Sequence, residues 1–584
     1  MLSRRSTFPI LVSLFCAPAL LMSCGGKGSG TPTSTPTTQS ITVTVSPQGA
    51  KLAPSGTQQF TATVSGTSNT GVTWSVPAGS GTVSSTGLYT APGTPPSPSD
   101  FNVTATSVAD ATKSGTALIT VEVHHDNQNA QTPPIELGTS GGNSTDQTTT
   151  TVNGRQQTQC CSGTLGSLIS RGGTFYILSN NHVLDKSDQG VPNDPIGQPG
   201  LAESNCGTQP VPITVAHMSQ AAPLKGGSVD AAMAQIVSGM VNTNGTILDL
   251  NSVGQPAPPS ATPAVAQLNE PVAKSGDATG LTCSSVNSIS TTVTVDYQTS
   301  CGGTTTFPVT FTNQISIAGA TFSNNGDSGS LVVDSTNARP IGLLYAGNPQ
   351  GTVANPIGDV LTALKDPTSG EIPVIVGGAD HAVTCPPAGQ SQIAAQEKTQ
   401  VRPSLSSAAL AHAIVVKDKR QYQLMQDPAV GSVRVGQSED NPSQAALVVH
   451  LNSQPRLPIP RVLDGVRTRV VSDQEQAAAL LPKITAAQIQ SVIAIKEQHV
   501  KALMSNPAIF AVGVGASHDN PAEPAIVIYA EQGKQVSIPE QIDGVRTRVI
   551  VSERFRAFNW GTRTKNVCSS PVINSTKKLG RLTY

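Results

Sequence analysis

Three side chains suited to nucleophilic catalysis occur in separate segments of this 584-residue chain. His182 ends one apolar run, Asp230 precedes another, and Ser328 lies in a Gly-Asp-Ser-Gly turn ahead of a third. A serine hydroxyl is a poor nucleophile at its own pKa, but a neighbouring imidazole can take its proton near neutral pH. A carboxylate on the far imidazole nitrogen fixes the tautomer and stabilises the imidazolium. These residue types predict acyl transfer on Ser328 without a cofactor or metal.

The glycines around Ser328 predict an oxyanion site. They permit a turn in which the N–H groups of Gly326 and Ser328 converge on the developing negative charge. Asp185 is a rival to Asp230 as the partner of His182. It stands only three residues after that histidine, and a neighbour on the same turn seldom reaches the far ring nitrogen. We therefore favour Asp230.

The elements that position these residues read as strands, and their order resembles a known family. His182, Asp230 and Ser328, in that order and with Gly-Asp-Ser-Gly around the serine, resemble the trypsin/chymotrypsin superfamily. Segment 340–347 is similar to the substrate-pairing strand of that superfamily. Segment 274–283 looks like a strand-turn element of a bacterial branch, to which plant narrow-leaf-type proteins are distantly similar. The resemblance implies a double β-barrel and a serine-type endopeptidase acting on proteins or peptides.

The sequence departs from the animal members of this superfamily in one respect. In those enzymes a new Ile-Val-Gly-Gly terminus forms a salt bridge with the Asp beside the nucleophile. No such sequence precedes residues 163–166, so Asp327 needs another partner.

The alternative function, from another class, is a surface adhesion or scaffold protein with a pseudo-peptidase domain that binds without cutting.

Specificity follows from one position in the resemblance. The residue six places before the nucleophile lies at the base of the primary pocket in trypsin-like enzymes, and here it is Phe322. A phenylalanine offers no charge and fills volume, so burying an Arg or Lys head against it is costly. We predict a preference for small or medium apolar residues before the scissile bond.

The cysteines predict disulfides, provided that the chain is exported. Cys283 and Cys301 flank an alternating run at 288–297, so we expect them to close a hairpin-like loop. Cys206 is expected to pair with Cys160 or Cys161, between which the sequence does not choose.

The N-terminus supports export. Two arginines precede an apolar run at 8–22 that is short for a membrane span and typical of a signal peptide. Its end, Leu-Met-Ser-Cys followed by two glycines, resembles the bacterial lipobox, which implies lipidation of Cys24. We therefore expect a membrane-anchored lipoprotein of the cell envelope, at the outer membrane or cell surface. The net charge of -1 gives no reason to expect a nucleic-acid partner.

Residues 41–123 consist of short alternating β-branched segments separated by Gly, Pro and Ser, which predict a β-sandwich of about seven strands. With Trp74 as its expected core aromatic, this region resembles bacterial immunoglobulin-like domains. The polar stretch that follows is expected to be a linker. His124 and His125 lie in it without a partner cluster, so we do not assign a metal site there.

The C-terminal region contains a duplication. Residues 428–436 recur at 507–515, and Asp464-Gly-Val-Arg-Thr-Arg-Val recurs 79 residues later. This offset indicates two α+β units that pack on each other. The Asp-Asn-Pro sequences in both copies favour turns over calcium sites, and the alternating arginines favour a solvated face. Intramolecular contact between the repeats and the peptidase-like domain is one expected partnership.

The sequence therefore predicts a multidomain, mainly β protein: a β-sandwich, a chymotrypsin-like double β-barrel and two duplicated α+β units. The expected order is a signal peptide at 1–23, a tether at 24–40, the sandwich at 41–123, a linker at 124–154, the peptidase-like domain at 155–380, a linker at 381–410, the repeats at 411–473 and 490–552, and a basic tail at 553–584.

Overall fold

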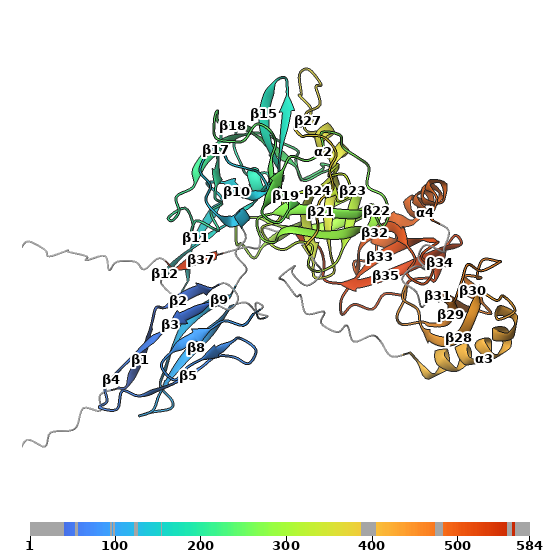
Figure 1. Ribbon diagram of the computed structural model, residues 1–584, viewed down its shortest axis with the longest axis horizontal. Coiled ribbons are helices and arrows are strands. Elements are labelled where there is room, and N and C mark those ends of the chain that lie inside the picture. Colours follow the sequence, from blue (N-terminus) through green and yellow to red (C-terminus); the bar gives the residue numbers. More distant parts are fainter. Residues whose placement is uncertain are drawn as a thin grey trace, which may run out of the picture.

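The computed structural model describes residues 40–52, 56–93, 96, 100–121, 126–152, 155–386, 405–472, 483–557 and 563–566. Cys24, His124 and His125 lie outside these residues. The described chain forms a β-sandwich, a central pair of β-barrels and two α+β units, shown from blue to red in Figure 1. The multidomain, mainly β fold class predicted from the sequence is confirmed. No helix among the described residues is long and apolar enough to cross a membrane.

The N-terminal β-sandwich has three small sheets around one apolar core that includes Phe60, Tyr89 and Ile119. The four-stranded sheet has the order β2 (Gly49–Leu52), β9 (Ser114–Val121), β8 (Asp100–Ser107) and β5 (Val72–Ser75). The two-stranded sheet pairs β1 (Thr42–Ser46) with β4 (Thr61–Ser65). The three-stranded sheet has the order β3 (Thr57–Gln59), β7 (Leu88–Thr90) and β6 (Thr82–Val83). Trp74 is only partly buried and packs against this core. The likeness to bacterial immunoglobulin-like domains stays a prediction.

The first barrel is closed by a bent strand. Its sheet runs β13 (Gly163–Leu165), β10 (Thr139–Asn143), β16 (Pro195–Gln198), β17 (Ile213–Ala221), β18 (Ala232–Ile236), β15 (Thr174–Ser179), β14 (Ser167–Arg171) and β27 (Val374–Ile375). β13 continues into β14 after Gly166, so the sheet closes on itself, and the short β27 adds to β14 outside this closure. A Cβ at Gly166 would lie 1.8 Å from the Gly329 carbonyl oxygen, so only glycine fits at this bend.

The second barrel closes directly. Its order is β21 (Pro271–Gly276), β24 (Leu331–Asp334), β25 (Pro340–Asn348), β26 (Gly351–Pro356), β23 (Thr306–Ala318) and β22 (Gly280–Gln298). β22 then pairs back with β21, and helix α2 (Ile357–Ala363) follows the last barrel strand in sequence, β26. The smaller elements of the central region are the 3-10 helix η1 (Asp126–Gln128), helix α1 (Asn181–Leu184), and the hairpins β11 (Gln147–Val152) with β12 (Arg155–Cys160) and β19 (Ile247–Ser252) with β20 (Gln255–Ala257).

The two C-terminal units share one topology: a helix, an antiparallel strand pair, and a strand parallel to the second. The first has α3 (Ser407–Leu424), β28 (Val430–Gln437), β29 (Ala445–Leu451), β30 (Val462–Leu463) and β31 (Val466–Ser472); the second has α4 (Ala486–Met504), β32 (Ile509–Ala516), β33 (Pro524–Glu531), β34 (Gln541–Ile542) and β35 (Val545–Ser552). A capping box between Thr485 and Gln488 starts α4, while the Ser406 hydroxyl caps α3.

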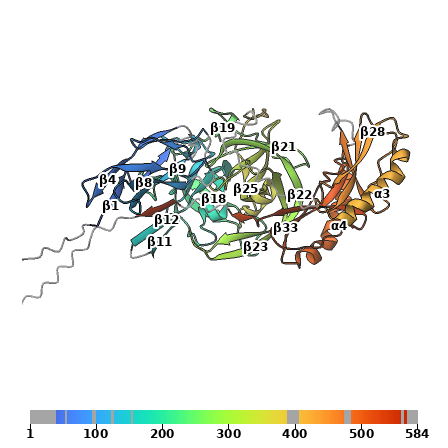
Figure 2. The same cartoon turned by 90° about the horizontal axis from the view of Figure 1, so that it is seen from below.

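The second unit is joined to the second barrel. β32 pairs antiparallel with β22, so the barrel sheet continues into the sheet of that unit. The chain then returns over the barrels, where β36 (Arg556–Ala557) pairs with β25 and β22, and β37 (Arg563–Asn566) pairs with β12. The red β37 beside β12 in Figure 1 and the red strands among the barrel strands in Figure 2 show this return.

Two expected boundaries are wrong. The predicted linker at 124–154 contains β10, a strand of the first barrel, together with Ile135 and Leu137, which are fully buried. β10 reads Thr-Ser-Gly-Gly-Asn, so it has no apolar side chain to signal a strand; its glycines allow Leu165 and Gly197 to approach closely instead. The predicted tail at 553–584 begins with residues that are part of the fold, because Phe555 and Ala557 are buried.

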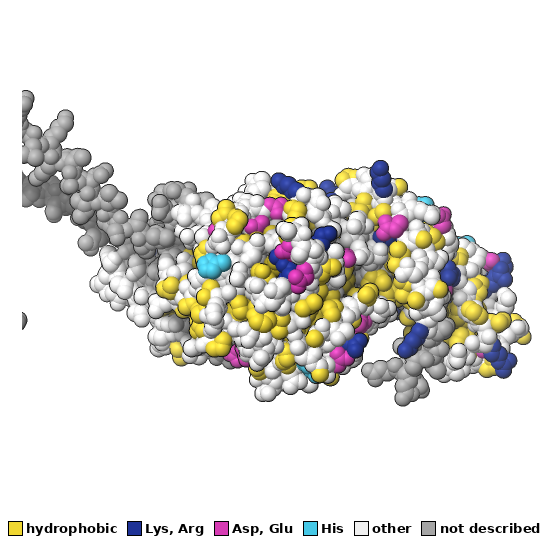
Figure 3. Space-filling view, turned by 90° about the horizontal axis from the view of Figure 1, so that it is seen from above, with side chains coloured by type: hydrophobic (Ala, Val, Ile, Leu, Met, Phe, Trp, Pro, Cys, Tyr) yellow, Lys and Arg dark blue, Asp and Glu magenta, His cyan; other side chains and the backbone are white. Residues whose placement is uncertain are grey.

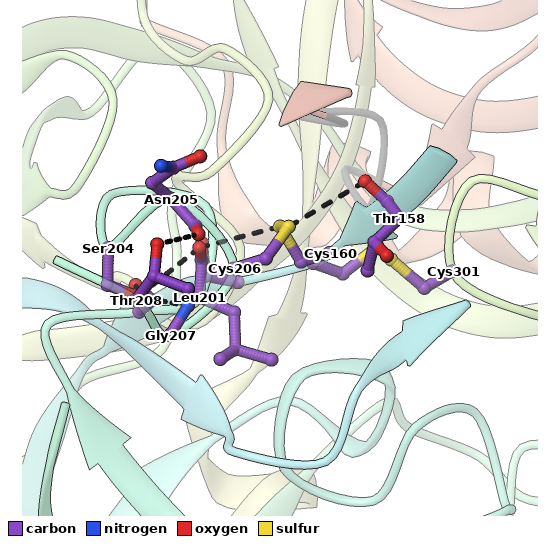
Figure 4. Close-up of a disulfide and its surroundings, with 12 residues drawn as sticks. Thr158, Cys160, Leu201, Ser204, Asn205, Cys206, Gly207, Thr208 and Cys301 are labelled. Atoms are coloured by element: carbon purple, nitrogen blue, oxygen red, sulfur yellow. Dashed lines mark hydrogen bonds between the residues drawn. A yellow bond between two sulfur atoms is a disulfide. The ribbon is translucent and has the colours of Figure 1, made fainter. Parts of the chain in front are cut away.

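The expected Cys283–Cys301 disulfide is also wrong. Cys283 pairs with Cys385, and Cys301 pairs with Cys161. Cys283 lies near the start of β22 and Cys301 lies beyond its end, and a strand advances roughly 3.3 Å per residue, so the two sulfurs are far apart. Cys206 pairs with Cys160, one of the two options left open by the sequence (Figure 4).

Three of the four alternating arginines of the repeats are buried rather than on a solvated face; Arg469 is partly exposed and forms an ion pair with Glu439 at 2.8 Å. Arg467, Arg546 and Arg548 are each 2% exposed. Arg467 and Arg546 lie between the two units beside the buried carboxylates of Asp440 and Asp519. Elsewhere charge is sparse: Figure 3 shows charged side chains, singly and in small groups of mixed sign, scattered over a mostly uncharged face, as expected for a chain with 12% charged residues.

Candidate active site

His182 and Asp230 meet in the first barrel. His182 lies on α1 directly after β15, and Asp230 precedes β18, which pairs with β15. The His182 Nδ1 atom is 2.5 Å from Asp230 Oδ2, and the backbone N–H of His182 donates to Asp230 Oδ1 at 3.3 Å. Asp230 rather than Asp185 therefore orients the imidazole. Nδ1 is the donor in this pair when the ring is neutral, which leaves Nε2 as the acceptor.

Asp230 is held by side chains from both barrels. The hydroxyl of Tyr297 on β22 donates to Asp230 Oδ2 at 2.9 Å. Asn180 and Asn355 each donate a side-chain amide hydrogen to the Asp230 carbonyl oxygen, at 2.8 and 3.1 Å. Burial, aided by the charge of Asp230, raises the pKa of Tyr297 well above its usual range, so this phenol remains a donor. Sequence reasoning missed Tyr297, because its 67-residue separation from Asp230 leaves no local signal.

Ser328 lies in a turn of the second barrel that faces the first. The Thr164 N–H donates to the Ser328 carbonyl oxygen at 2.7 Å. Gly163 separates this turn from the histidine segment: a Cβ there would lie 2.6 Å from Val183 Cγ2 and 3.0 Å from the Ser328 carbonyl oxygen. The turn is also tied to β25, since the Gly329 N–H donates to the Leu344 carbonyl at 2.8 Å. The three predicted residues thus gather at the junction of the barrels.

The serine and histidine are not hydrogen-bonded to each other. Ser328 Oγ donates to the Tyr345 carbonyl oxygen at 3.2 Å, whereas His182 Nε2 is buried without a partner in the described part of the chain. His182 is 1% exposed, and Asp230 and Ser328 are 0% exposed. The described conformation is therefore a closed site in which the hydroxyl is turned towards β25.

Lys274 supplies the partner that Asp327 needs. Its ammonium lies 3.1 Å from Asp327 Oδ1, and both side chains are 0% exposed. Asp327 also accepts from the Asn324 and Thr279 backbone N–H groups, at 2.8 and 3.2 Å. Burial lowers the pKa of Lys274, and the charge of Asp327 opposes that effect. The nucleophile turn is thus held by a cation from within the chain, without a new terminus.

The turn leaves two backbone donors available. Among the described residues, neither the Gly326 N–H nor the Ser328 N–H donates to a protein acceptor. Gly326 has a φ of +106°, and a Cβ there would lie 2.7 Å from Asp277 Oδ2, so the position requires glycine.

Phe322 is packed in an apolar core. Its side chain is 1% exposed and belongs to the core of the second barrel, together with Val332 and Leu344. Its carbonyl oxygen accepts from the Thr282 hydroxyl at 2.7 Å. Its part in a specificity pocket stays a prediction.

The two barrels with a His–Asp pair and a serine at their junction define a chymotrypsin-like fold. No family model and no curated protein matches the chain. Among solved structures, it is similar to a glutamic acid specific serine protease described as using a novel histidine triad in substrate binding. The match has 16% identity and a TM-score of 0.28 and covers 41% of this chain and 100% of that one.

Proposed function

We propose that this chain is a serine endopeptidase that hydrolyses peptide bonds through an acyl-enzyme on Ser328. The observation that carries the proposal is the buried His182–Asp230 pair, 2.5 Å apart, beside the turn that presents Ser328. A histidine buried only for packing has no need of a carboxylate on one nitrogen and an open acceptor on the other.

In the proposed reaction, His182 Nε2 takes the Ser328 proton as Oγ attacks the peptide carbonyl. This requires the hydroxyl to rotate from the Tyr345 carbonyl towards the imidazole. The free Gly326 and Ser328 N–H groups support an oxyanion site, where preorganised donors stabilise the developing charge. His182 then gives the proton to the leaving amine, and water releases the acyl group by the reverse steps.

We further propose export and lipid anchoring through Cys24, supported by the signal-peptide and lipobox patterns of the sequence. The three disulfides accord with an oxidising compartment. Cys24→Ser should move the protein from the membrane fraction to the soluble fraction. A serine variant that stays with the membrane would contradict the anchor.

Ser328→Ala should abolish hydrolysis of a peptide library and labelling by a fluorophosphonate probe, because only an activated serine reacts with that probe. Loss of a triad member typically lowers kcat by several powers of ten. Ser330→Ala, two residues away in the same turn, is the matched control and should still be labelled. If neither the folded wild-type protein nor a folded variant lacking residues 553–584 cleaves or reacts, the non-catalytic scaffold is favoured instead.

A further inference from the structure

The short strand β36 lies along β25, the barrel strand whose Tyr345 carbonyl accepts from Ser328 Oγ. It is antiparallel to β25, with Ala557 opposite Ala346 and Arg556 opposite Gly347. On its other side β36 meets β22, where the Asp296 N–H donates to the Phe555 carbonyl at 3.2 Å. This stretch of chain is therefore held between two barrel strands.

β25 directs such a strand to the nucleophile. Tyr345 precedes Ala346 on β25, and its carbonyl accepts the hydrogen of Ser328 Oγ at 3.2 Å. A chain that runs antiparallel to β25, past Gly347 and then Ala346, next reaches Tyr345, whose carbonyl contacts Ser328. A peptide that adds to β25 as an extra strand needs these same backbone groups. The place that a substrate needs is already filled by this protein's own residues.

The side chains of this stretch show that it is seated. Phe555 and Ala557 are each 1% exposed and belong to one apolar cluster with Leu224 and Tyr345, whereas Arg556 between them is exposed. This alternation is that of a strand with one buried face. Phe555 and Ala557 therefore cover the apolar residues that a peptide would contact.

The second C-terminal unit holds the stretch in place. The Phe555 ring lies 5.7 Å from Phe510 on β32 and 5.5 Å from Tyr529 on β33, measured between ring centroids. Arg554 forms an ion pair with Glu531 at 3.0 Å. Because β32 is itself paired with β22, the unit is built onto the barrel and carries residues 553–557 to β25.

We propose that residues 553–557 form an inhibitory strap that occupies the substrate strand position on β25. The inference rests on the proposed peptidase function. Peptides reach Ser328 only when the strap leaves β25, so the repeats regulate the site. The closed triad, with Ser328 Oγ turned away from His182, is the strapped state.

The test replaces Glu-Arg-Phe-Arg-Ala at 553–557 with Gly-Ser-Gly-Ser-Gly in the full chain. The swap should raise the rates of fluorophosphonate labelling and peptide cleavage at least tenfold. Lys534→Gln, a change of an exposed side chain in the same unit but outside the strap, should leave both rates unchanged. If the swapped protein is folded by circular dichroism and is labelled at the wild-type rate, the strap is refuted while the peptidase stands.

A second arm needs no activity. A fluorescein-tagged Glu-Arg-Phe-Arg-Ala peptide, at up to about 1 mM to match the effective concentration of a tethered segment, should bind the swapped chain carrying Ser328→Ala. It should not bind the unswapped Ser328→Ala chain. Equal binding to both chains, or binding to neither, would overturn the strap. If no variant is ever labelled, the peptidase proposal fails. The binding measurement still decides whether residues 553–557 occupy the strand position on β25.

Discussion

At the scale of single residues, the site depends on two groups that its motif does not contain. Lys274 neutralises Asp327, the neighbour of Ser328, and Tyr297 donates to Asp230. Each buried carboxylate would be costly without such partners. His182, Asp230 and Ser328 could be predicted because the chemistry dictates their types and local sequence. Lys274 and Tyr297 could not, because any buried donor satisfies a carboxylate and only the fold decides which one is near.

Lys274→Met should disable the site without unfolding the barrels. It leaves Asp327 buried without its cation, which typically costs about 3–5 kcal/mol, and it loosens the turn that places Ser328. We expect a lower unfolding midpoint and a loss of about 100-fold or more in kcat/KM for a cleaved peptide. Lys365→Met, at an exposed position, is the control and should change neither quantity. Wild-type kcat/KM in Lys274→Met would show that the cation does not support the turn.

At the scale of elements, side-chain patterns predicted the strands that bury apolar residues and missed those that do not. The β22 and β25 runs are rich in β-branched and apolar residues, whereas β10 is formed by small residues that fill no core. The wrong Cys283–Cys301 pairing has a related cause. The alternating run at 288–297 suggests one arm of a closed loop, but it belongs to the single long strand β22, which holds Cys283 and Cys301 apart.

Gly513 on β32 should decide whether the second unit stays on the barrel. A Cβ there would lie 2.4 Å from Thr291 Oγ1 and 3.0 Å from Ser288 Oγ on β22. Gly513→Arg should therefore separate β32 from β22 and increase hydrogen exchange of both strands. The corresponding residue of the first unit is Arg434, which is exposed. Arg434→Gly serves as the control and should leave exchange in β22 unchanged; unchanged exchange in Gly513→Arg would contradict this account of the joint.

At the scale of the whole molecule, the two repeats form one body. The Ser438 hydroxyl donates to Asp519 at 2.5 Å, and the Ser517 hydroxyl donates to Asp440 at the same distance. Arg467 and Arg546 lie beside both carboxylates. Burial and the charge of Asp440 raise the pKa of Asp519. The 79-residue offset revealed the duplication, but an arginine that alternates along a strand looks the same whether it faces water or a second copy.

Asp519→Ala should destabilise both repeats together. It leaves two buried guanidiniums short of a counter-charge and removes the acceptor of Ser438, which typically costs about 3–5 kcal/mol. Asp543→Ala removes an exposed carboxylate paired with His499 and should cost about 1 kcal/mol or less. Denaturant unfolding of the full chain, followed by exchange at β29 and β33, measures both. Equal small losses in the two variants would mean that the buried cluster does not hold the repeats together.

The exchange of contacts between the repeats is reciprocal. Ser438 bonds Asp519 as Ser517 bonds Asp440, and the Val470 and Val549 N–H groups donate to the carbonyls of Asp519 and Asp440 respectively. In homodimers, such self-complementary contacts belong to interfaces with twofold symmetry. The repeat pair is thus equivalent to a homodimer whose protomers have been fused. Fusion makes the pairing of the two repeats independent of protein concentration. It also allows each repeat to diverge, and only the second repeat carries residues 553–557 to β25.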